Sequence, residues 1–168
     1  MREYLGSFVN ESGIFIVSDP CYELSTWCQG RLTDVATGKW AAFVKKADKK
    51  EWGIRCVELL AKHESVEHKI TNWELCSFLV GVDSGQAGIF DEKYYANNDA
   101  FSSKEIPESN YGNTKLYNFC CDITLSEKKA GVLPYGTVSS SGFGDGTFQC
   151  YISKNNDGKI IAIKIIFI

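Results

Sequence analysis

Apolar and polar residues alternate along much of the chain, as they do in β-strands with one buried face. Near the N-terminus this pattern predicts two strands, over residues 3–9 and 13–19, joined by the polar turn NES. The following segment, residues 31–46, predicts a hairpin whose turn lies at residues 36–38. The first part of the sequence therefore indicates mainly β-structure.

Two longer alternating segments, residues 52–63 and 70–83, predict another antiparallel pair. Apolar doublets at 59–60 and 78–79 interrupt the alternation and are candidate positions for a bulge. Near the C-terminus, an NNDG turn at residues 155–158 separates two alternating runs, which is a strong hairpin signal.

The region between these β-rich parts has a different character. The segment FDEKYYAN predicts a short helix with Asp91 as its N-cap. Residues 96–114 are polar and predict a long surface loop. Residues 115–125 fit a helix or a strand, and a helix is preferred. The expected class is α+β and predominantly β: an antiparallel sheet, a sandwich or a partly open barrel with one or two short helices.

Composition fits a single β-rich domain over residues 1–168. Apolar residues make up 44% of the chain and charged residues 23%, while aromatic residues are frequent at 13%. The net charge of −3 argues against a nucleic-acid partner, which would require a basic face. The lysine-rich stretch 45–51 is interrupted by Asp48 and Glu51 and predicts a solvated turn.

No targeting segment or membrane partner is expected. Residues 1–13 lack the apolar core of a signal peptide. The longest apolar run, IIAIKIIFI, is too short to cross a bilayer and contains Lys164. This run is expected to form either a central strand or an exposed edge strand. The sequence therefore predicts a cytoplasmic protein and leaves its oligomeric state open.

The seven cysteines do not indicate a metal or disulfide framework. Their number is odd, they are scattered, and they include no C-x-x-C pair. Most have apolar neighbours, as reduced cysteines in a protein core do. We therefore predict free thiols, no metal site built from cysteines, and no cofactor. The cysteines are Cys21, Cys28, Cys56, Cys76, Cys120, Cys121 and Cys150.

Three stretches combine glycine with aspartate near a predicted strand end. We call residues 12–20 the first stretch, residues 80–91 the middle stretch and residues 141–148 the last stretch. Glycine permits close backbone approach, and aspartate accepts backbone N–H bonds or coordinates cations. Candidate ligand-binding residues are Asp19, Asp83, Gly85, Ser141 and Asp145, and candidate catalytic residues are Asp83, Asp91 and Asp145.

Familiar chemistries are not supported by these stretches. The glycine spacing of the last stretch matches neither a Walker loop nor a dinucleotide fingerprint, and a strand follows it instead of a helix. No segment has the ligand pattern of an EF-hand. His63 and His68 have no metal-binding spacing, and G-x-S-x-G is absent. A composite metal site, drawing on Asp19, Asp83, Asp91 and Asp145, remains open.

The three stretches resemble the signature of a bacterial family of unknown function, domain of unknown function 4241. The shared pattern is S-G, an apolar run and D-P; then V-D-x-G with F-D; then S-G-x-G-D-G and an aromatic residue. It is carried here by Ser12, Gly13, Asp19 and Pro20; by Val82, Asp83, Gly85, Phe90 and Asp91; and by Ser141, Gly142, Gly144, Asp145, Gly146 and Phe148.

Two residues depart from the family pattern. Phe143 stands where tryptophan is common, and Phe148 stands where tyrosine is common. The resemblance spans residue 12 to the C-terminus and implies a shared fold. It implies no particular activity, substrate or cofactor.

We expect a non-catalytic binding module that recognises a protein or a small ligand. The alternative is a metal-assisted hydrolase that uses aspartates from the three stretches. A third hypothesis gives the motifs a purely structural role, with Asp145 accepting N–H bonds within its own turn. For Asp145 we predict a bond to its own backbone, as opposed to a place in a cleft shared with Asp83 and Asp91.

Overall fold

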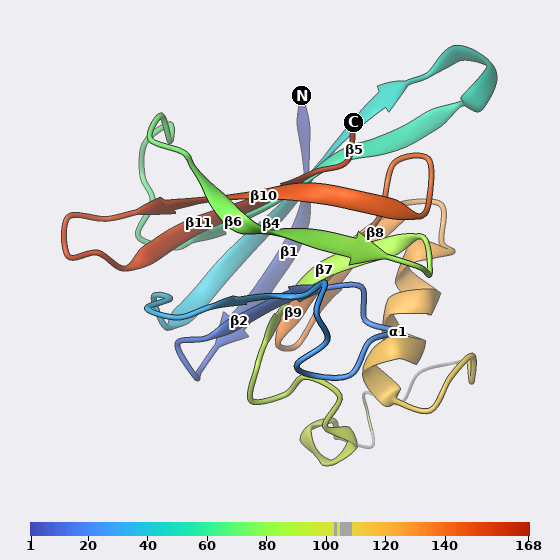
Figure 1. The fold of residues 1–168 in the computed structure, drawn as a ribbon, viewed down its shortest axis with the longest axis horizontal. Coiled ribbons are helices and arrows are strands. Elements are labelled where there is room, and N and C mark those ends of the chain that lie inside the picture. Colours follow the sequence, from blue (N-terminus) through green and yellow to red (C-terminus); the bar gives the residue numbers. More distant parts are fainter. Residues whose placement is uncertain (103, 105–108) are drawn as a thin grey trace.

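The computed structural model describes residues 1–102, 104 and 109–168 and consists of two stacked antiparallel sheets with one α-helix beside them (Figure 1). The expected α+β, predominantly β class is confirmed, in the form of a sandwich. Both sheets have free edges, because their strand orders do not close on themselves.

The larger sheet has six strands in the order β1–β4–β5–β11–β10–β6. All its neighbouring strands are antiparallel. The strands are β1 (Arg2–Asn10), β4 (Gly38–Asp48), β5 (Ile54–His63), β6 (Glu74–Val82), β10 (Gly146–Lys154) and β11 (Ile160–Ile166).

The smaller sheet has five strands in the order β3–β2–β7–β9–β8 and is also antiparallel. Strands β2 and β7 are buried along their whole length because they are covered on both faces. The strands are β2 (Phe15–Ser18), β3 (Gly30–Leu32), β7 (Gln86–Asp91), β8 (Ala130–Leu133) and β9 (Gly136–Ser140).

The main core lies between the two sheets. Its largest member, Trp40, is fully buried and contacts Phe15 edge-on across the interface, with ring centroids 5.1 Å apart. A second core lies on the other face of the smaller sheet, where α1 (Lys115–Thr124) packs against β8 and β9. Leu116 and Cys120 supply the helix side of this core. The smaller sheet is therefore the middle layer of three.

The predicted hairpin over residues 31–46 is wrong. Its two halves are strands, but β3 belongs to the smaller sheet and β4 to the larger one. The intervening chain crosses between the sheets, where Val35 donates its N–H to the Gly13 carbonyl and Ala36 donates to Ile160. Leu32 and Trp40 thus face the same core from opposite sides.

The predicted pairing of residues 52–63 with 70–83 is also wrong. These segments form β5 and β6 of one sheet, but β11 and β10 lie between them. The NNDG hairpin is confirmed and joins β10 to β11. Register shifts occur between Cys56 and Glu58 of β5, and between Leu75 and Leu79 of β6. The isoleucine-rich β11 suits this central place, since Ile163 and Ile165 are fully buried.

The predicted helix over 115–125 is confirmed as α1, whose N-cap is Thr114. The predicted helix over residues 90–97 is wrong, however: Asp91 ends β7, and turns follow it over residues 92–96. In the segment 96–114, the described part contains the 3₁₀-helix η2 (Asn98–Ala100), and Phe101 is buried in the second core. Residues 103 and 105–108 of this predicted loop lie outside the described residues.

Candidate functional site

The three glycine-aspartate stretches meet at one end of the sandwich, and Asp19 is the centre of their junction. Asp19 follows β2 and is fully buried. Its carboxylate accepts the amides of Asp83 at 2.9 Å and Ser84 at 2.6 Å, and the Ser84 hydroxyl at 2.6 Å. It also accepts the amide of Cys21 at 2.9 Å. Four donors therefore compensate the burial of this charge.

The last stretch is attached to the middle stretch through Gly85. The Gly85 amide donates to Asp145 Oδ1 at 2.9 Å, and its carbonyl accepts the Ser141 amide at 3.0 Å. The hydroxyl of buried Ser141 closes the turn by donating to the Gly144 carbonyl at 2.7 Å. Gly144 has a φ of +126°, which side-chain-bearing residues rarely adopt. The prediction that Asp145 bonds to its own backbone is therefore wrong, because its carboxylate accepts an amide of the middle stretch.

Asp91 lies apart from this junction, at the other end of β7. It too is fully buried, and its carboxylate accepts the amides of Glu11 at 2.6 Å and Ser12 at 3.3 Å. The Asp91 carboxylate also accepts the Ser12 hydroxyl, and it accepts the Lys93 amide at 3.0 Å. The structure therefore brings together Asp19, Asp83, Gly85, Ser141 and Asp145 and leaves Asp91 at a second junction.

Asp83 and Asp145 are exposed, in contrast to the two buried aspartates. The hydroxyl of Tyr22 donates to the Asp83 carboxylate, and this bond raises the pKa of Tyr22. Within the described residues, no group of three or more His, Cys, Asp or Glu side chains is placed to hold a metal ion. His63 is engaged by Ser65 and by the Thr37 carbonyl.

The cysteines are all free, and five of them are buried. Cys21 is exposed and adjoins the Asp19 junction, where partial burial and then the Asp19 carboxylate raise the pKa of its thiol to about 12. A thiol with this pKa is a poor nucleophile at neutral pH. The burial of these five thiols agrees with the prediction that most of the cysteines are core residues.

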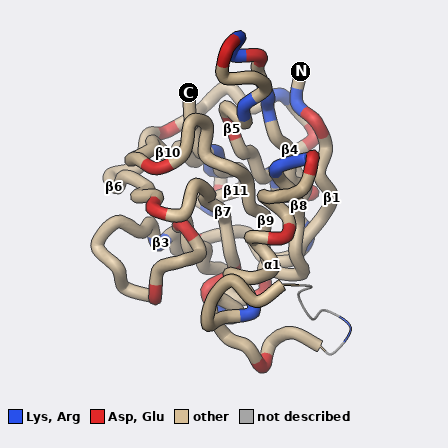
Figure 2. The backbone as a smooth tube through the Cα atoms, turned by 90° about the vertical axis from the view of Figure 1, so that its right-hand side faces the viewer, with Lys and Arg blue, Asp and Glu red and all other residues tan. Residues whose placement is uncertain are grey.

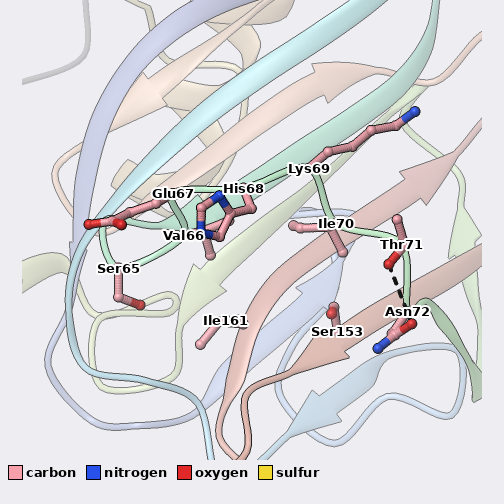
Figure 3. Close-up of a pocket in the computed structure, with 10 residues that line it drawn as sticks. All are labelled: Ser65, Val66, Glu67, His68, Lys69, Ile70, Thr71, Asn72, Ser153 and Ile161. Carbon is pink, nitrogen blue, oxygen red and sulfur yellow. Dashed lines mark hydrogen bonds between the residues drawn. The ribbon is translucent and has the colours of Figure 1, made fainter.

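A cavity of about 240 Å³ lies beneath the loop of residues 65–72 (Figure 3). Figure 3 shows the charged ends of Glu67 and Lys69 pointing in opposite directions, with His68 between them. The hydrogen bond from Thr71 to Asn72 joins neighbouring residues of the loop. The polar side chains that line this cavity therefore do not converge on a common point.

A second cavity, of about 340 Å³, adjoins the Asp19 junction and is lined by Cys21, Tyr22 and Tyr117. The Tyr22 hydroxyl is occupied by Asp83, and the Cys21 thiol is protonated. These side chains give the cavity little capacity for acid-base or nucleophilic chemistry.

A third cavity, of about 240 Å³, is built by the last stretch itself. Gly142, Phe143 and Gly144 form part of its wall, with Arg55 and Lys129 as its charged residues. We call it the Arg55 cavity. Beside it, the ring of Phe143 packs edge-on against Trp52, with centroids 5.8 Å apart. Sequence reasoning missed this grouping, because these residues are far apart along the chain and Trp52 adjoins a stretch that resembles a solvated turn.

Replacement of Asp145 by alanine is expected to lower the free energy of unfolding by about 1 kcal/mol, because one hydrogen bond to the Gly85 amide is lost at an exposed position. Urea denaturation measures this change. A loss above about 3 kcal/mol would contradict a single-bond role for Asp145.

Taken together, the fold and the junctions define a two-sheet β-sandwich whose turns are fastened by aspartate carboxylates. The chain belongs to the family described as protein of unknown function (DUF4241), whose model matches residues 8–165. The three stretches of the family resemblance are thus the segments that form the two junctions. Comparison with curated proteins and with solved structures gave no match. None of the described helices is both long and apolar enough to cross a membrane.

Proposed function

We propose that this protein is a non-catalytic binding module that recognises a protein partner through the surface formed by Trp52 and Phe143. Both residues are exposed, Trp52 at 64% and Phe143 at 58%, and their rings pack against each other. Exposed tryptophan and phenylalanine side chains of this kind are typical anchors of protein interfaces. We call this pair the aromatic patch.

The surroundings of the aromatic patch support a protein partner. Ile54 adds a further apolar side chain, 59% exposed, at the start of β5. The tip of the β4–β5 hairpin carries acidic and basic residues side by side (Figure 2). An apolar centre with a charged rim of both signs is the usual composition of a protein interface. The net charge of −3 makes a nucleic acid a less suitable partner.

The metal-assisted hydrolase has less support from the geometry. It requires carboxylates that are free to bind a cation, but Asp19 and Asp91 are buried and already accept several N–H and O–H donors. Asp145 is engaged by Gly85. These contacts favour a structural role for the aspartates, so the proposed binding surface is the aromatic patch.

We further propose that the module works in the bacterial cytoplasm, since its thiols are free.

Serine in place of Phe143 or Trp52 is expected to weaken partner binding by about tenfold or more, as for a typical interface hot spot. Immobilised wild-type protein and variants would be incubated with lysate, and retained proteins quantified by mass spectrometry. A photo-crosslinking residue in place of Phe143 then identifies the protein that touches it. Purified partner provides the dissociation constants.

Trp27→Ser is the matched control, because Trp27 is 90% exposed and is not part of the aromatic patch. Proteins retained by wild type and Trp27→Ser, but lost with Phe143→Ser and Trp52→Ser, would support the proposal. Equal retention by all four proteins, with no crosslink from position 143, would overturn it.

A further inference from the structure

Arg55, which lines the Arg55 cavity, has a buried donor that the described residues do not use. Among the buried side-chain nitrogen and oxygen atoms of the described residues, only Arg55 Nε has no hydrogen-bond partner. A buried donor without an acceptor costs free energy, and natural structures contain few of them. Because Arg55 also lines the cavity, its guanidinium is the group that an acceptor bound in the cavity would meet.

A second positively charged side chain in the cavity also favours a bound acceptor that is negatively charged. Lys129 also lines the Arg55 cavity. None of the residues that line this cavity is an aspartate or a glutamate. In the part of the chain that the structure describes, neither Arg55 nor Lys129 takes part in an ion pair. Cys56 on the same wall stays a neutral thiol, because burial raises its pKa. The cavity therefore has two positive charges and no fixed negative charge.

The backbone of the last stretch has two amides without a hydrogen-bond acceptor among the described residues. Gly142 and Phe143 line the Arg55 cavity, and their amides donate no hydrogen bond to any described residue. The volume of about 240 Å³ accommodates a small anionic group together with water. Main-chain amides of glycine-rich turns commonly bind anions in this way.

We infer that the Arg55 cavity binds an oxyanion group of the ligand, a carboxylate or a phosphate. Arg55 would hold it with its guanidinium fork, which matches two oxygens of either group, and Lys129 would supply a second charge. This inference rests on the proposed function, because it assigns the polar contact next to the aromatic patch. The ligand would thus place an anionic group beside an apolar one.

Titration with inorganic phosphate and with acetate, at constant ionic strength, tests this inference by ¹H–¹⁵N NMR. We expect saturable shifts of the Gly142, Phe143 and Gly144 amides in the wild type. Arg55→Gln should raise the dissociation constant by about tenfold or more, since it removes charge-assisted hydrogen bonds. The anion that binds more tightly identifies the ligand group as carboxylate or phosphate.

The neighbouring lysines provide a matched pair of variants. Lys129→Gln should weaken binding, whereas Lys128→Gln should leave it unchanged, because Lys128 is exposed and does not line the Arg55 cavity. If Arg55→Gln fails to give a dispersed spectrum, Arg55→Lys replaces it: the charge remains but the fork is lost, and weaker binding is still expected.

Shifts that stay linear for both anions in the wild type would overturn the inference, as would equal affinities in wild type, Arg55→Gln and Arg55→Lys. The proposed function would survive this outcome, since the aromatic patch is tested separately by partner capture. Conversely, anion binding without any effect of Phe143→Ser on partner capture would remove the protein-binding proposal and leave the cavity assignment.

Discussion

Replacement of Asp19 by alanine is expected to lower the free energy of unfolding by about 3–5 kcal/mol. Its carboxylate is fully buried and accepts three amides and one hydroxyl from two separate segments. Alanine would leave these donors without an acceptor in the interior, and each such donor costs free energy. Urea denaturation followed by tryptophan fluorescence measures the loss.

Asp83→Ala is the matched control for this substitution, because it removes a carboxylate from the same junction. Asp83 is exposed, and the side-chain bond it accepts comes from Tyr22. The expected loss is below about 1 kcal/mol, as for other exposed polar contacts. Comparable losses for Asp19→Ala and Asp83→Ala would show that buried hydrogen bonding is not what distinguishes Asp19.

Asp91→Ala is the second substitution with a large expected effect, a loss of about 2–4 kcal/mol. The buried Asp91 carboxylate fastens the turn between β1 and β2 to the end of β7 through Glu11 and Ser12. Because this contact is local to one junction, the amides of residues 11–13 should also exchange their hydrogens faster. Hydrogen exchange with mass spectrometry measures this change.

Asp157→Ala is a suitable control for Asp91→Ala. Asp157 is an exposed residue of the NNDG turn, and its amide, not its carboxylate, takes part in the turn's hydrogen bonding. We expect a change within about 0.5 kcal/mol and no effect on residues 11–13. Unchanged exchange at residues 11–13 in Asp91→Ala would contradict the fastening role of Asp91.

The sequence was sufficient to locate most strands but not to pair them. Alternation reports which face of a strand is buried, and it did so correctly for β3 and β4. Leu32 and Trp40, however, bury against the same core from opposite sheets, so the pattern looks the same as that of a hairpin. The NNDG turn, by contrast, did predict a pair of strands, because a tight turn of this kind places the strands on either side of it next to each other, here β10 and β11.

The candidate site, too, was predicted from the sequence only in part. The glycine-aspartate stretches were recognisable because turns require these residue types, and five of the candidates do lie together. That Asp91 forms a separate junction depends on the length and direction of β7, which no motif encodes. Arg55 could not be found from sequence, because an arginine in an alternating strand gives no sign of an unpaired buried nitrogen.

The central place of β11 has a consequence for biosynthesis. Strand β11 pairs with β5 on one side and β10 on the other, and it follows every other strand in the chain. Until a ribosome has released residues 160–166, the sets β1–β4–β5 and β10–β6 have no hydrogen bonds between them. The larger sheet is therefore completed only after β11 has been synthesised, and until then nascent chains must keep the edges of β5 and β10 from pairing with other molecules.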